Sequence, residues 1–476
     1  MESGPIAPSP ELKIRPRLVH ALLAVAGTAL LLGVGYGMYR IRIEVLLVAA
    51  TTLAGCMALW LGLGWREIHA GMMQSIMKGL PAMLIVVVVG ALVGSWMAAG
   101  VIPMIIHSGL GLISPRLFLV TASVATGIVS MLTGTGFGTI GTVGVAFMGI
   151  AHGLGVPPGE AAGALVSGAY LGDKVSPFAA NANLAVAVSR VNIFDHIRHS
   201  LWTTLPALSV ALAVYAVTGF KAAATPAASS GDEGLRSALA GHFTFSAWLL
   251  VPPAITIWAM VRNRPVIPGM LLSAGAAAVL AVTVQRLPLA DAAGAMVTGY
   301  SSHSGFSPLD KLLSQGGMLS MMPVTLIALC AFALSGVMQK AGLFEPLLER
   351  LHRFANTPGR LIAATGASCV AVEMMTGSAF LCILLPGELF APAFRRMELA
   401  AKNLSRTIGD CGIVGVPLIP WSIAAAFMSS ALGVATAEYA PWAVFCYAGA
   451  AFTLVSGLTG FAVAPRRADD ETQPGS

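Results

Sequence analysis

Residues 167–187 read SGAYLGDKVSPFAANANLAVA and place two adjacent charged residues, Asp173 and Lys174, in a run of small and apolar residues. The run is long and apolar enough to cross a bilayer, but a Gly-Asp-Lys and a Ser-Pro interrupt it. Only 10% of the chain is charged. A carboxylate at mid-bilayer costs roughly 2.5–3.5 kcal/mol on insertion scales. We therefore expect Asp173 to face a cavity or a partner and to serve as an ion site.

The composition of the whole chain is typical of an integral membrane protein. Hydrophobic residues make up 56% of it, and the mean hydropathy is +0.81. The net charge of +6 comes from basic residues scattered singly between apolar runs, which is typical of membrane loops and not of a nucleic-acid surface. The six cysteines include no CxxC pair, so neither a disulfide framework nor a zinc site is indicated. We predict an all-α polytopic protein of the cell membrane, embedded in the lipid bilayer and without nucleic-acid partners.

Apolar runs and their interruptions predict about ten full crossings and two re-entrant helical hairpins. Uninterrupted crossings are predicted at 18–39, 43–63, 80–106, 199–219, 244–261, 266–284, 321–340 and 440–463. Residues 117–152 and 361–392 have a Gly/Thr/Ser break midway and are predicted as hairpins, since irregular backbone at membrane depth must face protein or a water-filled cavity. Residues 160–188 and 403–432 are predicted as crossings broken in the middle.

The distribution of basic residues predicts that both termini are cytoplasmic. With that orientation, 19 of the 27 Lys and Arg residues lie inside, including those of an expected loop at 66–78, and Lys174 lies within the membrane. The predicted organisation is then given by five parts: a cytoplasmic tail at 1–17, a first transmembrane half at 18–219, an external loop at 220–243, a second half at 244–463 and a cytoplasmic tail at 464–476.

The two halves resemble each other. The segment GLPAMLIVVVVGALVGSWMAAGV around Pro81 matches SMMPVTLIALCAFALSGVMQKAGL around Pro323, an offset of 242 residues. Further on, LGDKVSP matches IGDCGIVGVP, so that Asp173 corresponds to Asp410. The predicted orientation makes the repeats, 80–219 and 321–463, inverted. Inverted repeats with broken helices at corresponding positions are typical of secondary transporters, whose binding sites lie near the midplane.

Three blocks of the sequence resemble the NhaC family of sodium/proton antiporters, in the ion transporter superfamily. They are GTIGTVGVAFMGIAHGLGVPPGEAAGALVSGAYLGDKVSP, GYSSHSG followed by LDKLLSQGGMLSMM, and LPGELFAPAFRRMELAAKNLSRTIGDCGIVGVPLIPWS. The resemblance covers about 60 to 455 and implies alternating-access exchange of protons for a cation such as sodium. The chain has Ala180 and Ser378 where the family commonly has an acidic residue, and fewer oxygen-bearing side chains around Asp410.

Candidate site residues follow from the breaks and from the requirement that one carboxylate hold either a proton or a cation. The proton-coupling candidates are Asp173, Asp410 and Glu373, with Lys174 as a counter-charge. The substrate- or ion-binding candidates are Asp173, Asp410, Asn181, Asn183, Thr133, Thr135, Ser378 and Ser422. Each has a structural alternative: Asp410 could pair with Arg406, and the amides and hydroxyls could form interhelical hydrogen bonds.

Two other functions stay open on the sequence. A proton-coupled transporter of a small organic solute, an amino acid or a carboxylate, would suit the less polar surroundings of Asp410. A membrane-embedded enzyme is the remote alternative, because the acids stand isolated among glycines and apolar residues, away from any nucleophile with its base. No HExxH spacing occurs in the sequence. Five histidines are expected in solvated loops: His107, His152, His196, His199 and His352. We expect no enzyme activity, metal or cofactor.

Overall fold

The computed structural model describes residues 16–222, 232–262, 265–302, 310, 313–314 and 316–466. Among these residues all regular elements are helical apart from one isolated bridge between Leu399 and Pro465. Seven helices are long and apolar enough to cross a membrane, or up to ten if each of three bent pairs counts as one span. The prediction of an all-α polytopic membrane protein is confirmed. Most of the expected tails and part of the 220–243 loop lie outside the described residues.

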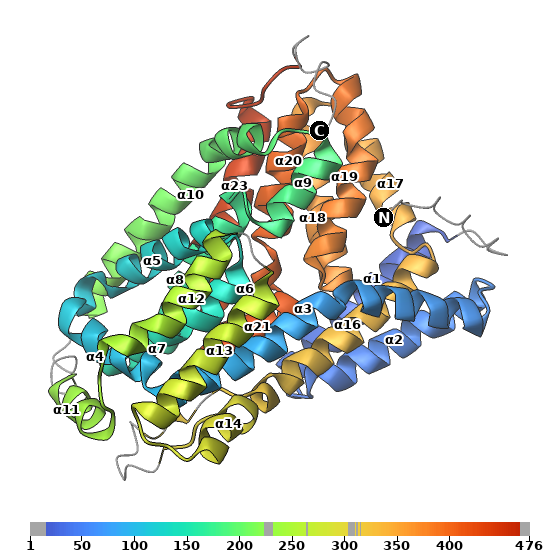
Figure 1. Ribbon diagram of the computed structural model, residues 1–476. Helices are drawn as coiled ribbons and strands as arrows, with labels where there is room; N and C mark the ends of the chain where they lie inside the picture. The colour runs from blue at the N-terminus through green and yellow to red at the C-terminus, as the bar shows by residue number, and fades with distance from the viewer. Residues whose placement is uncertain are drawn as a thin grey trace.

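The first half of the chain forms the blue, teal and green helices of Figure 1. They are α1 (Leu18–Gly37), α2 (Ile43–Trp60), α3 (Trp65–Ala99), α4 (Val101–Leu112), α5 (Phe118–Thr133), α6 (Gly136–Thr139), the π-helical η2 (Ile140–Gly144), α7 (Val145–Gly153), α8 (Pro158–Val175), α9 (Ala180–Ser189) and α10 (Ile193–Ala222).

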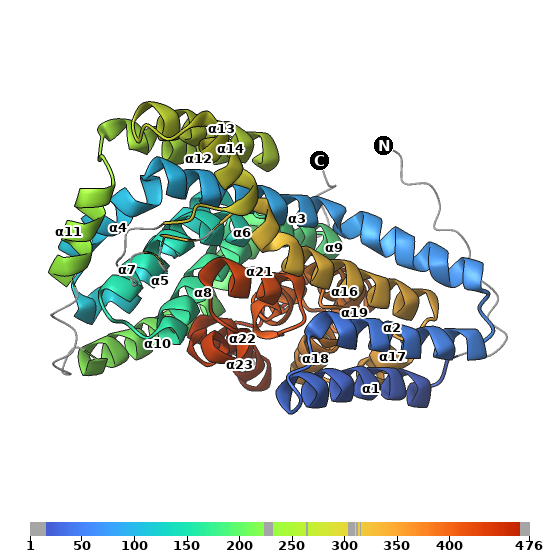
Figure 2. The ribbon, with the colours of Figure 1, turned by 90° about the horizontal axis from the view of Figure 1, so that it is seen from below.

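The second half forms the yellow to red helices, in which α12, α13 and α14 lie at the edge opposite to α1, α2 and α17 (Figure 2). Its elements are α11 (Asp232–His242), α12 (Val251–Val261), α13 (Val266–Thr283), α14 (Leu289–Thr298), α16 (Met322–Lys340), α17 (Glu345–Phe354), α18 (Pro358–Thr376), α19 (Ala379–Arg396), α20 (Ala401–Ile408), the π-helical η6 (Gly409–Ile413), the 3-10 turn η7 (Val416–Leu418), α21 (Ile423–Leu432), α22 (Thr436–Tyr439) and α23 (Val444–Thr459).

Helices α3 and α16, which carry the matching prolines of the two repeats, pack side by side. Glycines let them approach closely: a Cβ atom on Gly71 would lie 2.9 Å from the Gly336 carbonyl oxygen, and one on Gly336 would lie 2.4 Å from that of Gly71. Contacts between small residues of this kind drive helix association in membranes, where lipid supplies no hydrophobic force between helices.

The helix of the third crossing, predicted from residue 80, begins earlier in the chain. Helix α3 begins at Trp65 and runs without interruption through Pro81 for 35 residues, about 52 Å at 1.5 Å per residue. The expected cytoplasmic loop at 66–78 is therefore helical. Proline is tolerated in membrane helices where neighbouring groups satisfy the freed carbonyl, so it does not end the helix. As a consequence Lys78, expected in that loop, lies in the interior of a long helix.

The four predicted interruptions are confirmed in position. Helices α5 and α18 both end at a glycine in the left-handed conformation, Gly134 at φ +70° and Gly377 at φ +61°, the pair matched by the repeat. Helix α8 stops at Val175, and residues 176–179 separate it from α9. The second broken crossing changes from α20 to η6 and η7 and then bends by 50° into α21. The re-entrant character of the hairpins and the two-fold relation of the repeats stay predictions.

Side chains satisfy the backbone groups that these breaks leave open. The Ser176 hydroxyl donates to the Met131 carbonyl and accepts from the Phe178 N–H, and the Asn183 amide donates to the carbonyls of Pro177 and Ala179. At the second break, the Ser422 hydroxyl donates to the carbonyl of Val416, and the Tyr439 hydroxyl donates to that of Pro417. Such pairing is what permits irregular backbone at membrane depth.

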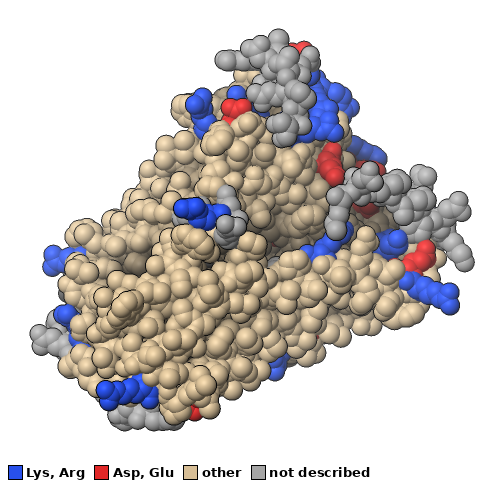
Figure 3. Space-filling model, viewed as in Figure 1, with Lys and Arg blue, Asp and Glu red and all other residues tan. Residues whose placement is uncertain are grey.

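The outer surface is suited to lipid. Figure 3 shows a mostly uncharged face, with charged side chains gathered at its upper end and along its edges and a few basic side chains nearer its centre. Large apolar side chains such as Leu30, Leu112 and Val279 are well exposed on the outer helices. In a membrane these side chains contact acyl chains.

Candidate functional site

A buried ion pair joins the broken crossings of the two halves. The Lys174 ammonium, on the last turn of α8, donates to a carboxylate oxygen of Asp410 in η6, and neither side chain has any exposed surface. The second Asp410 oxygen accepts hydrogen bonds from the hydroxyls of Thr203 and Thr453, each at 2.7 Å. Lys174 also donates to the Thr204 hydroxyl at 2.7 Å. Both charges are thus compensated within the protein, as buried charges require.

The surroundings of this pair correct two expectations. Arg406, a candidate partner of Asp410, donates instead to the Ala462 carbonyl and the Ser456 hydroxyl. His196, expected in a solvated loop, is fully buried on α10. Its ring nitrogens lie 3.0 Å from the Ser405 hydroxyl and 3.3 Å from the Lys174 carbonyl oxygen. The loop expectation failed because α10 begins at residue 193, earlier than its apolar stretch.

His199 is likewise buried, 3.1 Å from the Asn403 side-chain oxygen. The two histidines lie one turn apart on α10 and bond to residues of α20. They join the start of the second broken crossing to a helix of the first half. They therefore hold the segment that leads into Asp410.

Asp173 faces away from this network. Its carboxylate accepts a hydrogen bond of 2.9 Å from the Asn181 amide across the α8–α9 break, and 7% of the residue is exposed. In the described part of the chain no lysine or arginine forms an ion pair with it. Adjacent residues on a helix point about 100° apart, which explains why Asp173 and Lys174 have separate partners.

Close packing of α8 against α5 fixes the position of Asp173. A Cβ atom on Gly168 would lie 2.2 Å from the Ser123 carbonyl oxygen, and one on Gly172 would lie 2.3 Å from the Ser130 carbonyl carbon. The two glycines are one turn apart, so the helices meet along a strip of bare backbone. The Ser130 hydroxyl also donates to the Ala169 carbonyl at 2.5 Å. These contacts determine which way the end of α8 points.

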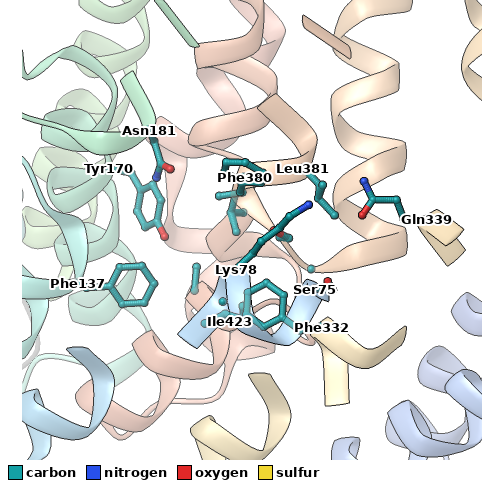
Figure 4. A pocket seen from close by; sticks show the side chains of 16 residues that line it. Ser75, Lys78, Phe137, Tyr170, Asn181, Phe332, Gln339, Phe380, Leu381 and Ile423 are labelled. Atoms are coloured by element: carbon teal, nitrogen blue, oxygen red, sulfur yellow. The ribbon is translucent and has the colours of Figure 1, made fainter. Parts of the chain in front are cut away.

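A cavity of about 330 Å³ lies beside Asn181, between the two halves. Figure 4 shows the side chains that line it, with Tyr170 and Asn181 on one side and Lys78 and Gln339 on the other. Three phenylalanines and the starts of α19 and α21 complete its wall; the lining residues of these parts are Phe137, Phe332, Phe380, Ser378, Ala379, Leu381, Ile423 and Ala424. Of the predicted site residues, Asn181 and Ser378 line this cavity directly.

Glu373, near the end of α18, is a buried carboxyl without a partner. Only 1% of the residue is exposed, and its Oε1 atom has no hydrogen bond from any described residue. A Cβ atom on Gly415 would lie 3.0 Å from the other oxygen, so the second break packs directly against the carboxyl. An uncompensated carboxyl in such a place is stable when it carries a proton.

Four of the predicted binding residues are occupied by structural contacts. The Asn183 amide and the Ser422 hydroxyl bind backbone carbonyls at the breaks. Thr135 caps α6 by accepting from the Gly138 N–H, and the Thr133 hydroxyl lies 3.2 Å from that of Thr139. Thr133 lines a different cavity, of about 80 Å³. The structural alternative for polar membrane residues therefore describes their contacts in this conformation.

Sequence reasoning missed the cavity's Lys78, Tyr170 and Gln339 and the threonines around the ion pair. Thr203 and Thr204 carried a signal, two adjacent hydroxyls just before Pro206 in an apolar helix. Lys78 would have been found by extending the apolar helix back through Pro81. In the ranges that the structure describes, no group of three or more His, Cys, Asp or Glu side chains could hold a metal ion.

Comparison with known proteins identifies the relatives of this chain. Residues 168–461 match the profile of the Na+/H+ antiporter family. An uncharacterized Na+/H+ antiporter of Haemophilus influenzae is 38% identical, over 94% of this chain and 97% of that protein. The Na+/H+ antiporter NhaC of Alkalihalophilus pseudofirmus is 35% identical, over 92% and 96%. A malate-2H+/Na+-lactate antiporter of Bacillus subtilis is 28% identical, over 94% and 96%.

Proposed function

This chain belongs to the Na+/H+ antiporter family, and we propose that it exchanges protons for sodium ions across the cell membrane, with Asp173 as the coupling carboxylate. The relatives whose similarity covers nearly the whole chain are named as antiporters of sodium ions and protons. The process is transport without a chemical step, and both termini are proposed to be cytoplasmic.

The observation that carries this proposal is the state of Asp173. Its carboxylate is buried and accepts a hydrogen bond from the Asn181 amide, and no lysine or arginine among the described residues pairs with it. Asn181 in turn lines the cavity. Removed from water, such a carboxylate needs either a proton or a bound cation. Because one site cannot hold both, filling it from one side of the membrane with a proton and from the other with a cation gives antiport.

Asp410 has a different role in this proposal. Its cation is already present as the Lys174 ammonium, so a second cation has no uncompensated charge to bind. We assign Lys174 as the counter-charge of Asp410, and the pair as the joint between the two broken crossings. Glu373 is assigned as a second proton carrier, because its carboxyl is buried without a partner beside the second break.

The test is a proteoliposome assay with a pH-sensitive dye inside the vesicles. Addition of external sodium should change the internal pH, while potassium and choline at the same concentration should have little effect. Vesicles without protein give the passive rate. Identical responses to sodium and choline would refute sodium coupling.

A second candidate function, coupling to a small organic solute, is favoured by the dimensions of the cavity. Its volume of about 330 Å³ falls in the range of small-molecule sites, roughly 300–1,000 Å³. A bare ion needs far less room. This candidate is compatible with sodium and proton coupling, because Asp173 is outside the lining and contacts it through Asn181.

A further inference from the structure

We propose that the cavity between α3, α8, α16, α19 and α21 binds a small organic monocarboxylate, with Lys78 as its ionic partner. The inference rests on the proposed function, in that this cavity is taken as the transport site. It adds the chemical class of a solute and a residue that recognises it. Three independent features of the lining support it.

The first feature is the charge of the lining. Lys78 is the one ionisable Lys, Arg, Asp or Glu side chain among the described residues that line the cavity. Its side chain points into the cavity, toward Phe380 and Leu381 (Figure 4). Its side chain is exposed, and within the same described part of the chain it has no hydrogen bond or ion pair. An ammonium beside an apolar wall attracts an anion.

The second feature is the backbone. Helix α19, 18 residues long, begins at Ala379, and its first turn lines the cavity; so does the first turn of α21, which begins at Ile423. The N-terminus of a helix presents the positive end of the helix dipole, which favours a carboxylate. In α21 the N–H groups of Ile423 and Ala425 already donate to the Gly377 carbonyl and the Ser422 hydroxyl, so this helix contributes mainly its dipole. In transporters, broken helices direct such ends at anionic substrate groups.

The third feature is a set of largely buried residues whose hydroxyls have no protein partner. Ser75, Tyr170 and Ser378 are 4%, 2% and 3% exposed, and all three line the cavity. No hydrogen bond of their hydroxyls is found among the described residues. None of the three hydroxyls is among the fully enclosed unpaired polar atoms of the described residues, so they remain accessible from the cavity. These three, with the Gln339 amide opposite Tyr170 in Figure 4, supply the donors that a carboxylate and a neighbouring hydroxyl would accept.

The remaining wall of the cavity determines what the uncharged part of the bound carboxylate can be. Phe137, Phe332 and Phe380 give the cavity an apolar surface for a short carbon chain. No carboxylate lines it in the described part of the chain, so an amino acid's ammonium group would lose its hydration without an ionic replacement. One lysine balances one carboxylate. The geometry therefore points to a monocarboxylate without an amino group.

The experiment measures binding to the purified full-length protein in detergent by calorimetry. Butyrate and L-lactate, as sodium salts, are compared with butyramide, which has the same carbon chain without the charge, and with L-alanine. We expect butyrate or lactate to bind and butyramide and alanine to bind at least roughly tenfold more weakly, as befits loss of a charge-assisted hydrogen bond.

The variants test Lys78 itself. Lys78→Gln should weaken carboxylate binding roughly tenfold or more, and Lys78→Arg should restore most of it. Arg66→Gln, an exposed position on the same helix outside the lining, removes an equal charge as a control. Gel filtration establishes that each variant is folded. Equal binding of butyrate and butyramide, or unchanged binding in Lys78→Gln, would overturn the inference.

The proteoliposome assay separates this inference from the proposed function. Sodium-driven pH change without carboxylate binding overturns the inference and leaves Na+/H+ exchange standing. Carboxylate binding that Lys78→Gln abolishes, with no sodium-driven pH change in the presence or absence of the carboxylate, supports the inference and refutes sodium coupling.

Discussion

Lys174 and Asp410 lie 236 residues apart in the sequence and form an ion pair that is completely buried where the broken crossings of the two halves meet. Three threonine hydroxyls complete the hydrogen bonding of the pair. Lys174 is thus separated from its sequence neighbour Asp173, whose carboxylate bonds to Asn181 beside the cavity. In the proposed mechanism, one aspartate of the repeat is neutralised and the other is left to bind a proton or a cation.

The ion pair should stabilise the fold only as a pair. Lys174→Met leaves the Asp410 carboxylate buried without its cation and should lower the free energy of unfolding by roughly 3–5 kcal/mol. In the double variant with Asp410→Asn, Thr203 and Thr453 still donate to the amide oxygen, and most of the loss should be recovered. Thermal unfolding of the purified proteins in detergent gives the comparison. A single variant as stable as the wild type would show that Asp410 does not need Lys174.

Asp173→Asn should abolish sodium-driven proton flux while the protein remains folded. Asparagine keeps the size and can keep a hydrogen bond with Asn181, but it can neither release a proton nor offer a negative charge. Proton flux in proteoliposomes and yield after gel filtration are measured together. Asp195→Asn, the same change at an exposed site on α10, is the control. Near-normal flux in Asp173→Asn would remove Asp173 from the coupling step.

Glu373→Gln should show whether this buried carboxyl carries protons or has only a structural role. Because Glu373 has no partner among the described residues, the neutral isostere should change the free energy of unfolding by no more than about 1 kcal/mol. If Glu373 carries protons, the flux should fall severalfold. Glu388→Gln, exposed on α19, is the matched control. Full flux in Glu373→Gln would leave the residue a purely structural role.

The predicted topology can be tested by labelling single cysteines in intact cells. In a Cys56→Ser background, which removes the exposed native thiol, a membrane-impermeant maleimide should label Ala240→Cys from outside. It should reach Asn356→Cys only after the membrane is opened, because residues 340–360 are predicted to be cytoplasmic. Both positions are exposed in the described structure. Labelling of Asn356→Cys alone in intact cells would invert the topology.

The sequence by itself determined the membrane class, most of the crossings and the positions of all four breaks. These features are local: an apolar run of sufficient length crosses the membrane, and clusters of Gly, Pro, Ser and Thr, as around Gly134, Gly377 and Ser176-Pro177, favour an interruption. Internal repetition in the sequence also singled out Asp173 and Asp410. The start of α3 was missed because Pro81 does not end a helix that has neighbours in a membrane.

Only the tertiary structure decided which partners and surroundings each charged residue has. Lys174 and Asp410 meet across 236 residues, and Lys78 enters the cavity because α3 extends past Pro81 and packs on α16. In a membrane helix, lipid-facing and core-facing positions are both apolar, so periodicity does not reveal which side turns inward. The rotation of each helix about its axis is set by backbone contacts such as Gly172 on Ser130, and those contacts separate Asp173 from Lys174.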